Sequence, residues 1–136
     1  MLHEDYLVRM FLALAAAIKN SIIKSRGDGD PSGAADLIEA ALSDASEIDG
    51  TLLLKLAPES MASMLELAGT DPKLAGYISR SLILESEFLT DAGQPEKASL
   101  RYRQGVALAD KFGLFVDTEN FDEDLEQFLE SEEQEA

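Results

Sequence analysis

One short pattern occurs twice in this chain of 136 residues, and it constrains the fold more than any other feature. Residues 29–42 and 93–106 align without a gap at an offset of 64, and they share the pattern G-x-P-x-x-A-x-x-x-[IY]-x-x-[AG]-[LV]. A glycine turns the chain between two helices, a proline begins the second helix, and an alanine permits a close approach to the first. The residues that carry the pattern are Gly29, Pro31, Ala34, Ile38 and Ala41 in one copy and Gly93, Pro95, Ala98, Tyr102 and Gly105 in the other.

Hydrophobic periodicity predicts helices along the rest of the chain as well. Near the start, Leu7, Phe11 and Leu14 recur at the spacing of one helical face. The middle of that helix is apolar nearly all round, so we expect it to be covered on more than one side. Aromatic residues make up only 7% of the chain, and this favours close-packed helices over a sheet. We therefore expect an all-α fold, a right-handed α-solenoid or bundle of about five to seven helices in antiparallel pairs.

The predicted helices and turns divide the chain into five parts, of which the first four form one helical domain over residues 1–130. We expect a first helix pair over 1–50, a short degenerate pair over 51–69, a second well-formed pair over 70–113, an acidic C-terminal helix over 117–130 and a flexible acidic tail over 131–136. In the short part, residues 51–56 have no partner strand anywhere in the sequence, so we interpret them as a short helix.

The second copy of the pattern resembles a tetratricopeptide repeat (TPR), whose second helix carries small, large and small residues after a turn glycine. Here Gly93, Ala98, Tyr102 and Gly105 match, whereas Glu85 stands where an apolar residue is usual. The offset of 64 is close to twice the TPR period of about 34, so residues 51–69 would lie between two better pairs. The resemblance implies stacked helix pairs with a peptide-binding concave surface.

The whole chain also resembles an uncharacterised bacterial all-helical family that opens with D-Y-φ-x-R-M, where φ is apolar. The matching residues are Asp5-Tyr6-Leu7-Val8-Arg9-Met10. That family has a TPR-like hairpin downstream and no established activity, so the resemblance implies a fold and supplies no function.

The charge of this chain excludes some partners. The formal net charge is −16, and residues 117–136 contain ten acidic residues and no basic one. Nucleic acids and anionic membranes are bound through Lys and Arg that displace counterions, so we expect neither as a partner. The apolar run Met10–Ile18 lacks the basic flank of an export signal and is too short to span a bilayer, so we expect a buried helix and a cytoplasmic location.

The sequence contains few residues in arrangements suited to catalysis. The chain has no Cys, and its single histidine, His3, lies at the terminus with no partner to orient it. We expect no catalytic residue, no cofactor and no metal site. Glu85 is the most interesting polar residue, either as a groove carboxylate that recognises a cationic group or as a side chain that forms an ion pair with Arg101 or Arg103 or simply faces solvent. We favour the ion pair or solvent exposure over recognition, and we expect the two arginines to point outward because they flank an inward Tyr102.

Two functions are compatible with these features. The first is a non-enzymatic interaction module that binds an unidentified protein or basic peptide through a helical groove or the acidic surface. The second is a structural protein that forms a homodimer through its apolar first helix, with Leu7, Met10, Phe11 and Leu14 in the interface. In the alternative to this dimer, the C-terminal helix covers the same residues within one chain.

Overall fold

Helices are the only regular secondary structure in the part of the chain that a computed structural model describes, which is the backbone of residues 2–45 and 50–135 and the side chains of 6–45 and 50–131. The elements are α1 (Leu2–Ile22), one turn of π-helix (Ile23–Gly27), α2 (Pro31–Ala45), α3 (Gly50–Leu53), α4 (Pro58–Leu67), α5 (Pro72–Asp91), α6 (Pro95–Lys111) and α7 (Phe121–Glu135). The expected all-α class is confirmed. The predicted short helix over residues 51–56 is present as α3, which ends at Leu53 and is followed by a turn.

The turns that separate the helices follow the predicted rules. Asp30 caps α2, because its Oδ1 accepts a hydrogen bond of 2.9 Å from the Gly33 amide, and Pro31 is the first helical residue. Gly29 and Gly93 adopt φ of 66° and 79°, a left-handed conformation that residues with a Cβ rarely adopt. Both copies of the sequence pattern therefore mark the start of the second helix of a pair.

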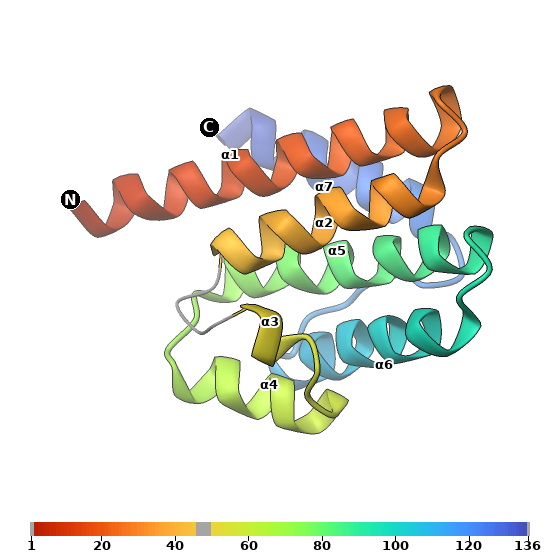
Figure 1. The fold of residues 1–136 in the computed structure, drawn as a ribbon. Helices are drawn as coiled ribbons and strands as arrows, with labels where there is room; N and C mark the ends of the chain where they lie inside the picture. Colours follow the sequence, from red (N-terminus) through yellow and green to blue (C-terminus); the bar gives the residue numbers. More distant parts are fainter. Residues whose placement is uncertain (1, 46–49, 136) are drawn as a thin grey trace.

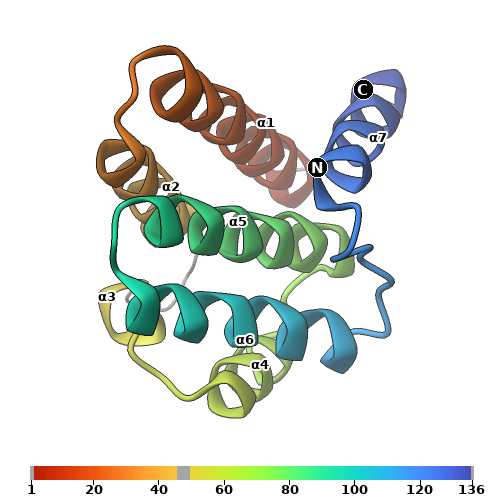
Figure 2. The same cartoon turned by 90° about the vertical axis from the view of Figure 1, so that its right-hand side faces the viewer.

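The two helix pairs pack directly against each other. α1 pairs with α2 and α5 with α6, and α5 lies against both α1 and α2 (Figure 1). The prediction that residues 51–69 lie between the pairs is wrong, because α4 packs on α6, on the side of the molecule away from α1 (Figure 2). Direct packing of α2 on α5 leaves no place for another pair between them.

α5 is the central helix of the fold, and every residue from Leu74 to Ser86 is buried. A helix without an exposed face requires cover on all sides, which α1, α2, α6 and α7 supply. We expected α1 to be covered on more than one side, and it packs on both α2 and α5. The outward face of α1 exposes Val8 and Leu12, the latter to 59%.

The acidic helix α7 docks within the chain through aromatic and charged contacts. The Tyr77 ring of α5 stacks on Phe11 of α1 at 5.4 Å between centroids and meets the edge of Phe128 of α7 at 4.8 Å. Arg80 of α5 lies over the Phe128 ring and forms a 2.7 Å ion pair with Asp124. The helix continues to Glu135, beyond the residue 131 at which we expected a tail to begin.

α5 and α6 approach each other closely at Gly105. A Cβ placed on this glycine would lie 2.7 Å from Ile83 Cγ1 and 2.9 Å from the Ser79 carbonyl oxygen. The Ser79 hydroxyl donates a 2.7 Å hydrogen bond to the Gly105 carbonyl across the same interface. The predicted role of a small residue at this position is confirmed.

We predict that Gly105→Ala destabilises the fold although alanine is the better helix former. The added methyl forces backbone separation, at a cost of about 1–3 kcal/mol in the free energy of unfolding measured with urea. Gly76→Ala is the matched control, since its Cβ would meet only ordinary contacts at 3.5 Å and should stabilise by up to about 1 kcal/mol. A Gly105→Ala protein as stable as the Gly76→Ala protein would contradict the prediction.

Candidate functional site

The inward face of α6 carries a buried arginine. Ala98, Arg101, Gly105 and Leu108 recur every three or four residues and are all buried, so they form the stripe that faces the interior. Arg101 is 5% exposed, whereas its neighbour Tyr102 is 41% exposed. A charged group in this position requires partners for its donors.

Arg101 obtains these partners from four parts of the chain. Its Nε donates to Glu85 Oε2 at 3.0 Å, and its Nη2 donates to Glu39 Oε1 at 3.0 Å. Its Nη1 donates to the Leu54 carbonyl at 2.8 Å and to Gln104 Oε1 at 3.1 Å. One guanidinium therefore connects α2, α5, α6 and the turn after α3.

Gln104 extends the same network to the turn after α3. Its amide Nε2 donates to the carbonyl oxygens of Leu54 at 3.0 Å and Leu56 at 2.9 Å. These carbonyls belong to a chain segment that leaves a helix of only four residues, so no helical amides satisfy them. Arg101 and Gln104 thus fix the turn after α3 against α6.

The environment of Glu85 favours the protonated form of its carboxyl group. The residue is completely buried, and its Oε1 receives no hydrogen bond from any donor in the described part of the chain. Burial, with a contribution from the neighbouring Glu39 carboxylate, raises the pKa of Glu85 to about 8 against the lowering effect of Arg101. A proton on the carboxyl group gives the second oxygen a hydrogen to donate toward Glu39.

Glu39 is the ionised partner of this pair. Burial acts to raise its pKa, but hydrogen bonds from Glu85, Lys97 and Arg101 outweigh burial and lower that pKa to about 2. Lys97 Nζ lies 2.9 Å from the same Oε1 that accepts from Arg101. The buried charges therefore balance as one guanidinium, one carboxylate and one neutral carboxyl group.

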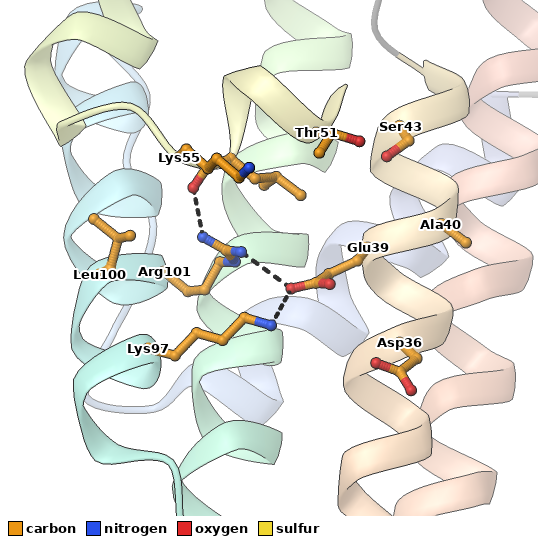
Figure 3. A pocket seen from close by; sticks show the side chains of 10 residues that line it. Asp36, Glu39, Ala40, Ser43, Thr51, Lys55, Lys97, Leu100 and Arg101 are labelled. Carbon is orange, nitrogen blue, oxygen red and sulfur yellow. Dashed lines mark hydrogen bonds and ion pairs between the residues drawn. The ribbon is translucent and has the colours of Figure 1, made fainter. Parts of the chain in front are cut away.

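A groove lies directly above this network. It is a hollow of about 600 Å³ between α2, the segment from Thr51 to Lys55, and α6 (Figure 3). We call it the α2–α6 groove. Its lining includes Glu39, Ala40, Ser43, Lys55, Lys97 and Leu100, which together offer charged, hydroxyl and apolar surface. The network beneath holds the walls at a fixed separation.

The structure decides between the interpretations of Glu85 and its neighbours. Arg101 is the partner of Glu85, one of the alternatives that we favoured, at 3.0 Å between Nε and Oε2, and Glu85 does not line the groove as a recognition residue because it is buried beneath it. The expectation that Arg101 points outward and Tyr102 inward is wrong. Ala98 and Gly105 face inward as the TPR pattern requires, but Arg101 takes the inward position between them that we assigned to Tyr102.

The residues proposed for a homodimer interface lie on the inner side of α1. Met10 and Leu14 are buried within the chain, and Leu7 and Phe11 pack partly buried against the same core. Phe11 stacks on Tyr77 of α5, which in turn contacts Phe128 of α7, and α1 packs mainly on α2 and α5. Within one chain, only Leu7 and Phe11 of these four residues keep part of their surface exposed.

By length and composition alone, α1 and the turn after it are long and apolar enough to cross a membrane. The segment Tyr6–Gly27 has 22 residues and a mean hydropathy of 1.5, and 22% of it is buried. Core helices of soluble proteins and export signals pass the same test of length and composition. The nine-residue run considered in the sequence is thus part of a longer apolar helix.

Metal chemistry receives no support from the described part of the chain, which contains no group of three or more His, Asp or Glu that could hold a metal ion. The side chain of His3 lies outside the described residues.

Comparisons with family models, with curated proteins and with solved structures found no match to this chain.

We predict that Glu85 gives the stability of the protein a distinctive pH dependence. The folded state keeps the Glu85 proton up to about pH 8, whereas an unfolded chain releases it near the ordinary glutamate pKa. Between these values the folded state binds one proton more, so the free energy of unfolding decreases as pH rises from about 5 to 8, by on the order of a few kcal/mol.

Glu85→Gln should remove most of this decrease, because the amide can still accept from Arg101 and donate to Glu39 without titrating. Urea unfolding from pH 5 to pH 9 measures the effect, with the exposed Glu96→Gln protein as control. Parallel pH profiles for wild type and Glu85→Gln would show that Glu85 is ionised in the folded state.

Proposed function

We propose that this protein is a non-enzymatic interaction module that binds a peptide segment of a partner protein in the α2–α6 groove. The observation that carries the proposal is a groove of about 600 Å³ above a network whose buried donors are already paired. Polar groups that pair with each other hold the groove in shape without a ligand, and such preorganisation reduces the entropic cost of binding.

The packing of the helix pairs agrees with this proposal. We infer a TPR-like fragment of a right-handed α-solenoid, in which the α1–α2 pair stacks on the α5–α6 pair. Such repeats present open surfaces between neighbouring elements to extended peptides. The net charge of −16 favours capture of basic segments, because an acidic protein attracts cationic partners over a distance of about a Debye length.

An enzymatic role has less support from the same geometry. Glu85 and Glu39 form a carboxyl pair with widely separated pKa values, as some acid–base catalysts do. However, Glu85 is completely buried behind Arg101 and does not reach the groove surface. The pair therefore supports a structural function for this carboxyl group.

The proposal predicts that peptides selected on the protein bind in the α2–α6 groove. Peptides from a random phage-displayed library would be selected on the wild type, and their affinities measured by calorimetry. Ala40→Trp places a large ring in the groove and should weaken binding by at least about tenfold.

Ala16→Trp is the matched control, because Ala16 is exposed on the outer face of α1, away from the groove. Its affinity for the selected peptides should equal that of the wild type. Selected peptides that bind Ala40→Trp as tightly as wild type would exclude the groove as the binding site.

A further inference from the structure

The charged groups of the α2–α6 groove are not all used by the network beneath it. Arg101, Glu39 and Lys97 are paired with one another. Asp36 and Lys55 also line the groove, and both are exposed. Neither forms an ion pair within the part of the chain whose side chains are described. These two residues therefore remain available to a ligand.

The two available charges are opposite in sign and lie at opposite ends of the groove. Figure 3 shows Asp36 at the lower end on α2 and Lys55 at the upper end beyond α3, with Glu39 at a level between them and Lys97 on the opposite wall, level with Asp36. A ligand with a single charge would satisfy one end and leave the other unpaired. A ligand with one cation and one carboxylate would satisfy both, in one orientation only.

The surface between these ends is suited to an apolar stem. Ala40 and Leu100 line the groove from opposite walls, on α2 and α6. Aliphatic chains of Lys and Arg pack on such surface while their charged ends reach a polar partner. Lys97 does not compete for Asp36, since it is held at 2.9 Å from Glu39. A volume of about 600 Å³ lies within the range of small-ligand sites.

We propose that the α2–α6 groove binds a short dipolar group, in which a cationic side chain pairs with Asp36 and a carboxylate pairs with Lys55. This chemistry occurs in a free basic amino acid and at the end of a peptide chain that terminates in Arg or Lys. The inference rests on the proposed function and specifies which segments the groove prefers. It also explains why a groove in a protein of net charge −16 keeps an exposed lysine at its upper end.

Calorimetric titration tests this inference with four probes. They are an acetylated Gly-Ala-Leu-Arg peptide with a free carboxylate, its C-terminal amide, the free-acid peptide with Gln in place of Arg, and free arginine. We expect the free-acid Arg peptide to bind about tenfold more tightly than either its amide or its Gln counterpart. Binding of free arginine as tight as that of the peptide would identify the amino acid as sufficient.

Two variants test which residue of the groove pairs with each charged group of the ligand. Asp36→Asn should abolish the preference for Arg over Gln, and Lys55→Met should abolish the preference for the free acid over the amide. Asp44→Asn and Lys111→Met change exposed residues outside the groove and should leave both preferences intact. Each variant removes one preference and keeps the other, which a general loss of folding would not do.

The outcomes separate this inference from the function on which it rests. In one outcome, library-selected peptides bind and lose affinity in Ala40→Trp, but none of the four probes binds or both preferences are absent. The dipolar inference is then overturned, and the groove remains a peptide site. If the selected peptides bind independently of Ala40 as well, both proposals are overturned.

Discussion

The structure depends on a guanidinium buried where three helices and a turn meet. Arg101 holds Glu39, Glu85, Gln104 and the Leu54 carbonyl at once, so its five N–H donors connect segments that are distant in sequence. A buried charge is tolerated only when it is paired and fully hydrogen-bonded. Glu39 supplies the opposite charge, and protonation of Glu85 prevents an excess of negative charge in the interior.

The groove follows from this network and from the short α3. A four-residue helix cannot satisfy the carbonyls of the turn that follows it, and these carbonyls bind to α6 through Arg101 and Gln104. The segment from Thr51 to Lys55 thereby forms one wall of the groove. The same interactions that stabilise the interior thus create the only surface here for which we propose a ligand.

Much of the fold could be predicted from the sequence, because turn glycines, helix-starting prolines and apolar periodicity are local signals. Gly29 and Gly93 correctly predicted the turn before the second helix of each pair, and Ala34 and Ala98 are buried as expected. The sequence could not show whether Arg101 or Tyr102 faces the interior. The two residues are adjacent on α6, and Tyr102 is the more hydrophobic of them. Glu85, close to Leu82 and Leu89 on its helix, was the available signal, as a buried carboxyl group requires a nearby donor. The groove could not be predicted from the sequence. One of its walls is held by backbone carbonyl groups, which every residue has and which therefore leave no signal in the sequence.

The central claim is that Arg101 holds the turn after α3 in place and so preforms the groove. Hydrogen exchange of the amides of residues 54–56, compared among wild type, Arg101→Met and Arg103→Met, tests it most directly. The account predicts that exchange accelerates in Arg101→Met at this turn while the α1 amides stay protected, and that Arg103→Met, which changes an exposed side chain, matches the wild type. Unchanged exchange of these three amides in Arg101→Met would contradict the account.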